Sequence, residues 1–552
     1  MYYCNEELKP SWHPYLRVDH SDAQTRIFRQ SLSQLLPFAA ASIMLQLASK
    51  AALGKQAKEA AHVFIGLIFS FIVYGASGTV ILAALTAVVF LCVMALRAVV
   101  RSSATPGALR MATALIWFLA AAFIVLGVYC KESRGGFVLQ VFPWVRHLTP
   151  LDRLSAGEVR WYMAAGMHTL RLVSFGMDAL WAEAAPGAAD APSGAPPRPP
   201  AALAYDWTQP AVARVQIEGR MYKQRVKTHH EAAVYSNFLM VLGYFFYPPL
   251  MLGGPVTTFN AWASHVHKPQ SSYSQRQVVI YLLRWAFCFL LLEVGMHYSP
   301  LLSFAKHGVP LKDRFVRPQD IIAGSVWQLN YMWLKFLVLW RFHRAWALLE
   351  GFETPENMTA CVNNNFSLRG FWQGWHRSFN QWLVRYMYVP LGGSRVPIWR
   401  QLFNTGVVFG FVAVWHDVKP ALLLWGWMFA LAFIPELSAA AWANSQHSTA
   451  RSARDSGWMR VLTAVGGAVN ILALIIANFL GYASSQAGVL FLLKAAFVVE
   501  GASGSFSPNW ATILCSMVML YTAAQLVALR AAMDSDSSLR LLGSSQPKPK
   551  GA

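Results

Sequence analysis

Two stretches of the sequence each hold a Trp-His pair: FWQGWHRSFNQWLVRYMYVPLGG at 371–393 and FVAVWHD at 411–417. At 3.6 residues per turn, the first stretch predicts a helix with one aromatic face and one polar face. The aromatic face carries Trp375, Phe379, Trp382 and Tyr386, and the polar face carries Arg377, Gln381 and Arg385. We therefore expect an amphipathic helix at a membrane interface, with His376 and Asn380 one turn apart beside its aromatic face.

The second stretch lies in the apolar region 402–442, which is interrupted at 416–420 by the polar sequence HDVKP. We read the flanking apolar runs as short against the roughly 20 residues that cross a bilayer, and so expect the interruption at membrane depth. Polar backbone is tolerated there only where protein or water surrounds it, so a cavity wall is the natural place for His416. Asp417 could orient the His416 imidazole, but an ion pair with Lys419 is the simpler interpretation.

Each Trp-His pair also has a purely structural interpretation, because aromatic residues at a membrane boundary commonly anchor a helix. The chain holds two such pairs, one in a predicted amphipathic helix and one in a broken apolar segment. This combination favours one shared site over two separate anchors. We therefore treat His416 and His376 as candidate catalytic residues.

The composition sets the class of protein. The chain has 552 residues, of which 55% are hydrophobic, 14% aromatic and only 13% charged, as expected of a polytopic membrane protein. The net charge of +20 could indicate a nucleic-acid partner. The basic residues, however, sit in short loops between apolar segments, which fits anionic lipid surfaces and no nucleic acid.

The apolar segments predict an all-α fold with about 11 or 12 transmembrane helices, plus re-entrant or interfacial helices. Thirteen candidate segments lie at 35–53, 62–75, 79–96, 111–130, 161–180, 235–252, 278–297, 321–340, twice within 402–442, and at 461–482, 487–499 and 510–529. His168, Arg171 and Asp178 interrupt one of them and must face protein or an interface. Tyr247-Pro248-Pro249, followed by Gly253-Gly254-Pro255, predicts a broken or re-entrant helix.

The chain divides into five expected regions. These are a polar segment at 1–34, transmembrane helices at 35–181, a flexible linker at 182–202, a catalytic core at 203–530 and a disordered tail at 531–552. The linker consists of Ala, Pro and Gly and cannot form a core. No metal site is indicated, because the His residues at 229–230, 265 and 267 lack Cys or carboxylate partners at a ligand spacing.

The two Trp-His motifs together resemble the signature of the membrane-bound O-acyltransferase (MBOAT) family. The segments VDHSDAQTRIFR (18–29), YFFYPPLMLGGPVTTFN (244–260) and WRFHRAWALLEGFETPENM (340–358) resemble its glycerol-uptake-protein (Gup) branch, which is related to hedgehog acyltransferase-like proteins. The resemblance implies helices around a central cavity, partly lined by the 244–260 segment, in the endoplasmic reticulum membrane. It also implies transfer of a long-chain acyl group from acyl-CoA, a co-substrate, to a lipid or glycosylphosphatidylinositol (GPI) anchor, with no cofactor.

Acyl transfer of this kind needs a base, because a hydroxyl group is a poor nucleophile at neutral pH. We expect His416 to be that base, and His376, Asn380 or backbone amides to donate to the oxyanion. Arg377 and Arg385 are expected to bind acidic groups of the donor or of lipid headgroups. The expected substrate-binding residues are thus Asn380, Arg377, Arg385 and Trp415.

Two other classes of function remain open at the level of sequence. A glycerol or solute transporter should show internal repeats and a polar site between related halves, and we see neither. A catalytically silent MBOAT-like regulator would keep the fold without the chemistry. The presence of both histidines favours the enzyme.

Overall fold

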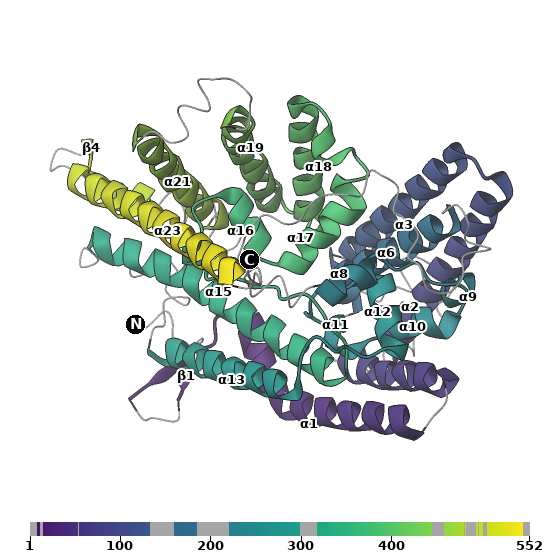
Figure 1. The fold of residues 1–552 in the computed structure, drawn as a ribbon. Coiled ribbons are helices and arrows are strands. Elements are labelled where there is room, and N and C mark those ends of the chain that lie inside the picture. Colours follow the sequence, from purple (N-terminus) through teal and green to yellow (C-terminus); the bar gives the residue numbers. More distant parts are fainter. Residues whose placement is uncertain are drawn as a thin grey trace, which may run out of the picture.

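The computed structural model describes residues 8–11, 15–52, 55–132, 159, 161–184, 220–298, 317–443, 457–479, 481, 493–494, 496–500 and 505–544. These residues are almost entirely helical, which confirms the all-α polytopic class (Figure 1). The described part also holds two short antiparallel strand pairs. They join β1 (Leu8–Pro10) to β2 (Arg17–Asp19) and β3 (Val498–Glu500) to β4 (Phe506–Pro508).

Seven helices in the described part are long and apolar enough to cross a membrane. They are α1 (Ala23–Ala52), α2 (Lys55–Ser103), α3 (Pro106–Glu132), α13 (Gln275–Tyr298), α19 (Pro420–Ala443), α21 (Gly457–Asn478) and α23 (Trp510–Ser544). Three more helices have the length for a crossing but fall short in apolarity: α6 (Ala165–Ala184), α15 (Pro318–Leu349) and α18 (Ile398–His416). Seven is fewer than the 11 or 12 expected, chiefly because of these three and of α2.

Helix α2 merges two expected spans, 62–75 and 79–96, into one element of 49 residues. Its backbone is kinked at Gly75, where φ is 72° and ψ is −179°, a conformation that glycine alone adopts readily. Near the kink, the Thr79 hydroxyl donates a hydrogen bond to the Gly75 carbonyl over 2.9 Å. The GASG sequence therefore bends the chain without ending the helix.

The expected span at 235–252 is broken, as the prolines predicted. Helix α10 ends at Phe245 and α11 begins at Pro248, where a missing N–H does no harm in the first turn. The short helices here are α8 (Arg220–Lys227), α9 (Ala232–Tyr235), α10 (Phe238–Phe245), α11 (Pro248–Met251) and α12 (Phe259–His267). Short 3₁₀ turns elsewhere are η3 (Trp161–Ala164), η6 (Val362–Asn364) and η8 (Gly393–Arg395).

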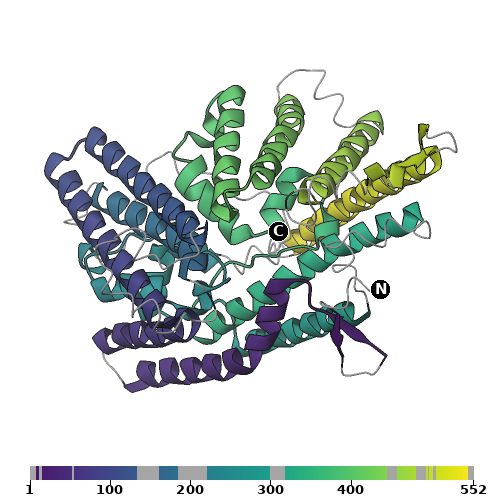
Figure 2. The same ribbon diagram turned by 180° about the vertical axis from the view of Figure 1, so that it is seen from behind.

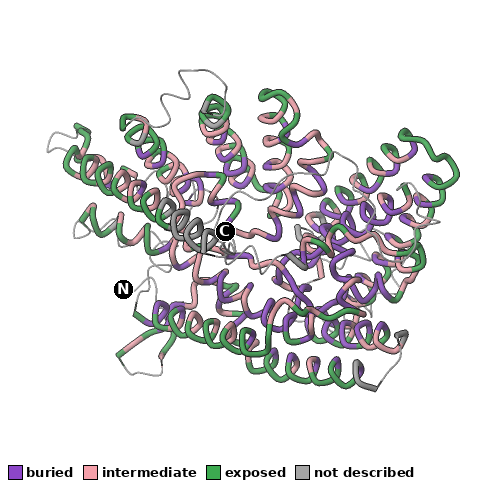
Figure 3. The backbone as a smooth tube through the Cα atoms, viewed as in Figure 1, coloured by how far each residue is buried: buried purple, intermediate pink, exposed green. Residues whose placement is uncertain are grey.

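Helix α15 runs through the middle of the molecule (Figure 1). Helices α18, α19, α21 and α23 spread out on one side of it, and α2, α3, α6 and the short helices form a compact group on another; the view from behind shows α1 and α13 alongside α15 (Figure 2). Burial follows this arrangement (Figure 3). Helix α6 is buried along almost its whole length, which confirms that His168, Arg171 and Asp178 face protein, whereas α13 and α23 expose apolar side chains on the outside.

Several helix boundaries differ from the boundaries of the expected regions. Helix α1 begins at Ala23, inside the segment 1–34 that was expected to be polar. Helix α23 continues to Ser544, so much of the tail expected to be disordered is helical; Ala, Met, Leu and Arg in it favour a helix. The expected span at 487–499 ends in strand β3, and most of it lies outside the described residues. The linker at 182–202 lies outside them from residue 185 onward.

Candidate functional site

The first Trp-His motif does not form the single amphipathic helix that its periodicity predicted. The chain forms α16 (Leu368–Gly374), breaks at two residues, and resumes as α17 (Arg377–Leu383) followed by the π-helical turn η7 (Val384–Tyr388). At the break Trp375 is extended, and His376 has φ 44° and ψ 46° in the left-handed region. A residue other than glycine in this region stores about 1–3 kcal/mol of strain, which surrounding structure must hold in place.

The loop that follows α15 holds this break. The backbone N–H of Arg377 donates to the Asn357 carbonyl over 3.2 Å, and the N–H of Ser378 donates to the Asn357 side-chain oxygen over 3.0 Å. Asn357 is fully buried. It thus satisfies two N–H groups that the helix start leaves free, and it fixes the direction in which His376 points.

The break turns the His376 ring toward α15. The ring stacks on Trp340 with 4.5 Å between centroids and an interplanar angle of 18°, and it lies 5.1 Å from the Phe379 ring. Neither ring nitrogen of His376 has a hydrogen-bond partner among the described residues. Trp340 therefore positions an imidazole whose polar atoms remain available.

The second Trp-His motif lies where α18 ends. His416 is the last residue of α18, Asp417 is extended, and α19 begins at Pro420. Lys419 and Asp417 form an ion pair with Nζ 2.9 Å from Oδ2, as the simpler interpretation predicted. The two helices contain 19 and 24 residues, so both helices are longer than the apolar runs that we inferred beside the break. The turn between them points into the middle of the molecule, near α16 and α17 (Figure 1).

Trp415 ties this turn to two other helices. Its indole Nε1 donates to the Gly166 carbonyl of α6 over 2.9 Å, and its ring lies 4.4 Å from the Phe379 ring of α17. The neighbouring His416 ring packs edge-on against Trp415 at 4.7 Å and against Trp425 at 5.8 Å. The orientation of His416 is thus set by aromatic contacts on two sides.

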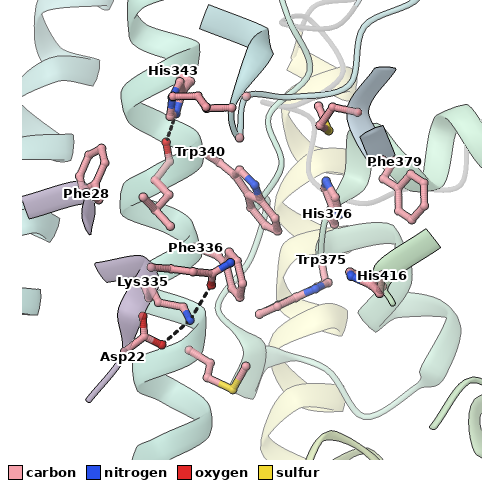
Figure 4. Close-up of a pocket in the computed structure, with 18 of the residues that line it drawn as sticks. Asp22, Phe28, Lys335, Phe336, Trp340, His343, Trp375, His376, Phe379 and His416 are labelled. Atoms are coloured by element: carbon pink, nitrogen blue, oxygen red, sulfur yellow. Dashed lines mark hydrogen bonds and ion pairs between the residues drawn. The ribbon is translucent and has the colours of Figure 1, made fainter. Parts of the chain in front are cut away.

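Both histidines line one cavity of about 1170 Å³ (Figure 4). Its walls are mostly aromatic and aliphatic, and its volume exceeds the roughly 300–1,000 Å³ of pockets for drug-sized ligands. Polar residues are a minority on the wall, and they include Asp22 and Lys335, whose side chains form an ion pair over 2.7 Å. Gly253 and Gly254 also line the cavity, so the broken 244–260 segment contributes to it. The expectation that His416 and His376 share a cavity is confirmed.

Three of the expected substrate-binding residues do not line this cavity as the described residues define it: Asn380, Arg377 and Arg385. Trp415 does. The polar face predicted for Arg385 is wrong, because its guanidinium is largely buried and lies 2.9 Å from the Asp178 carboxylate. The face predicted to be interfacial is buried as well, since Trp382 and Tyr386 are almost completely covered.

Sequence reasoning missed residues that hold the site together. Trp340 supports His376 and Asn357 supports the break; both lie in the 340–358 segment that resembles the Gup branch, but that resemblance assigned neither of them a role. Asp178 was noticed as a polar residue in an apolar helix, but its partner was not. It accepts hydrogen bonds from Arg385, from the Tyr386 hydroxyl at 3.0 Å and from the Asn260 N–H at 3.2 Å.

Fold and site together define a class of protein. The chain is a multi-pass membrane protein with an internal, largely apolar cavity, and two histidines from separate motifs face that cavity. Such a site suits proton transfer on a substrate that carries a long apolar chain.

Comparisons with known proteins agree. Residues 158–485 match the family model described as MBOAT, membrane-bound O-acyltransferase family, which covers more than half of the chain. The chain belongs to this family of membrane-bound acyltransferases.

Curated relatives place the chain within the family. It is 29% identical to "Membrane-bound O-acyltransferase GUP1" of Saccharomyces cerevisiae over 94% of this chain and 83% of the relative. It is 38% identical to the protein of the same name from Millerozyma farinosa, over about half of each chain. "Protein-cysteine N-palmitoyltransferase HHAT" of Mus musculus is 29% identical over 34% of this chain and 38% of that protein. The resemblance to the Gup branch is therefore confirmed, with HHAT a more distant relative.

Proposed function

We propose that this protein transfers a long-chain acyl group from acyl-CoA to a hydroxyl group of a lipid or a GPI anchor in the endoplasmic reticulum membrane. The observation that carries the proposal is the convergence of His376 and His416, from two separate motifs, on one apolar cavity. A cavity of this size has room for a long acyl chain, and its few polar groups limit where a reacting carbonyl can lie.

In this proposal His416 is the general base. Its imidazole takes the proton of the acceptor hydroxyl as the hydroxyl oxygen attacks the thioester carbonyl carbon. The tetrahedral intermediate then collapses, the C–S bond breaks, and the imidazolium returns its proton to the leaving thiolate. The products are the ester and free coenzyme A, so the reaction needs no further reagent.

His376 supports this chemistry in the proposal. Its ring nitrogens have no partner among the described residues, and its stacking on Trp340 holds the ring at the cavity wall. An N–H of this ring can donate to the developing oxyanion. Trp415 lines the cavity between the two histidines and would contact the acyl group.

Arg377 and Arg385 have different surroundings and therefore receive different roles in the proposal. Arg385 is committed to Asp178, so we assign it a structural role. Arg377 immediately follows His376 and forms no ion pair within 4 Å among the described residues, and it remains the candidate for acidic groups of the donor.

Acyl transfer by the purified protein tests the proposal. The protein, reconstituted in lipid nanodiscs, is given radiolabelled long-chain acyl-CoA and a panel of hydroxylated lipids, each paired with its O-methylated form. We expect label to appear in at least one hydroxylated lipid and in none of the methylated forms. Absence of transfer to every acceptor, combined with glycerol uptake by proteoliposomes that contain the protein, would support a transporter instead.

A further inference from the structure

His343 lies on the wall of the cavity that also holds His376 and His416, and it takes no part in the chemistry described above. It belongs to α15, three residues after Trp340, which corresponds to about 4.5 Å along the helix axis. The residue is 97% buried, because only 3% of its surface is exposed. Figure 4 shows His343, Trp340 and Lys335 in sequence along α15, with His376 across from them.

The hydrogen bonding of His343 defines its tautomer. Nδ1 lies 2.8 Å from the carbonyl oxygen of Leu339, and a carbonyl oxygen can only accept, so Nδ1 carries the hydrogen. No Asp or Glu of the described residues pairs with the ring, and a buried charge without a partner is costly. The ring is therefore neutral, and Nε2 presents a lone pair that accepts a hydrogen bond.

That acceptor is left without a partner. Nε2 of His343 is buried and has no hydrogen-bond partner among the described residues. An unsatisfied buried polar atom costs about 1–3 kcal/mol, and native structures rarely keep one without a reason. The backbone at Gly253 lies beside it: a side chain there would begin 4.0 Å from Cε1, the ring carbon bonded to Nε2. Because position 253 is glycine, no side chain fills the space beside that edge of the imidazole.

The geometry points to a ligand group that donates to His343 Nε2. We propose that this group is a second hydroxyl of the lipid acceptor, separate from the hydroxyl that reacts at His416, so that His343 selects lipids with more than one hydroxyl. The group that donates to Nε2 should be uncharged, because the wall near His343 is apolar. The charged side chain of Lys335 lies about two helical turns away along α15. This role of His343 rests on the acyl transfer proposed above and adds a feature of the acceptor lipid. It can be tested by ligand binding alone, without turnover.

Two substitutions at this position separate the two ring nitrogens. His343→Asn keeps an N–H that can donate to Leu339 but places nothing where Nε2 lies. His343→Gln places a carboxamide oxygen near Nε2 and so keeps an acceptor. Melting temperatures of both variants show whether they fold. If the His343→Asn variant does not fold, the His343→Gln variant still shows whether a hydrogen-bond acceptor at this position favours a ligand with free hydroxyl groups.

The experiment compares equilibrium dissociation constants in lipid nanodiscs for a long-chain monoacylglycerol and its di-O-methyl ether. We expect the wild-type protein and His343→Gln to bind the free diol more tightly than the ether. In His343→Asn the diol should bind roughly five- to thirtyfold more weakly, and the preference over the ether should disappear.

Two results would overturn the inference. If His343→Asn instead weakens binding of a non-hydrolysable acyl-CoA thioether, the donor is an amide N–H of coenzyme A. The second result is that His343→Asn changes the dissociation constant of neither the diol nor the acyl-CoA thioether, and that the wild-type protein and His343→Gln bind diol and ether equally well. Nε2 then faces only buried water. Either result leaves acyl transfer standing, whereas a wild-type protein that prefers the diol but never transfers an acyl group refutes the proposed function alone.

Discussion

Replacing Asp178 by Asn should destabilise the protein strongly, because it leaves Arg385 charged in a buried position. Asp178 is completely buried and accepts three hydrogen bonds, whereas the Arg385 side chain keeps 14% of its surface exposed. Removing one partner of a buried ion pair costs about 3–5 kcal/mol. We expect a value near the lower end, since Arg385 is not fully enclosed and Asn can still accept from the Tyr386 hydroxyl or the Asn260 N–H.

The free energy of unfolding in mixed micelles, followed by tryptophan fluorescence against denaturant concentration, measures this cost. Arg101→Gln is the matched control, because Arg101 pairs with Glu183 at 2.5 Å but is 64% exposed, and an exposed pair contributes only about 0–1 kcal/mol. The double variant Asp178→Asn, Arg385→Gln should be more stable than Asp178→Asn alone. If Asp178→Asn unfolds like the wild-type protein, or if the second substitution brings no recovery, the pair does not hold α6 to the first motif.

Two further predictions concern the supports of the histidines. Trp340→Ala removes the ring on which His376 stacks, so kcat for acyl transfer should fall while KM for acyl-CoA stays close to the wild-type value; an unchanged kcat would mean that the stack does not position His376. Gly166→Val should lower kcat as well, because a Cβ at Gly166 would lie 3.2 Å from Trp415 Nε1, whereas Gly406→Val on the same helix as Trp415 meets nothing within 4 Å and should have no effect. Equal kcat values for these two variants would contradict the role given to Trp415.

Much of the architecture follows from patterns that act locally. Apolar length predicts the spanning helices, and proline predicts the break before Pro248. Two polar interruptions in apolar sequence predict that Asp178 faces protein and that His416 lines a cavity. These inferences succeed because hydrocarbon leaves few choices for a polar group or an unpaired backbone. The same reasoning gives a poor count of membrane-spanning helices. A helix buried in protein, such as α6, differs from a lipid-facing helix in the segments that pack around it, and the helix's own sequence does not specify those segments.

The details of the site could not be predicted because they depend on contacts between distant segments. The left-handed conformation of His376 is held by Asn357, and its ring direction by Trp340, so helical periodicity alone gave an unbroken helix. Arg377 and Arg385 look alike in sequence, and only the position of Asp178, more than 200 residues before Arg385, distinguishes them. The pairing of Arg385 with a carboxylate so far away in the sequence depends on how α6 packs against the first motif.

The rate of acyl transfer by His416→Ala tests the central claim most directly. His416 is exposed to the cavity, so its truncation should leave folding and insertion intact, which gel filtration and melting temperature verify. Under single-turnover conditions with radiolabelled acyl-CoA, where the chemical step limits the rate, we predict a fall of roughly 10²- to 10⁴-fold in the rate constant. A folded His416→Ala protein that transfers the acyl group at the wild-type rate would show that His416 is not the base.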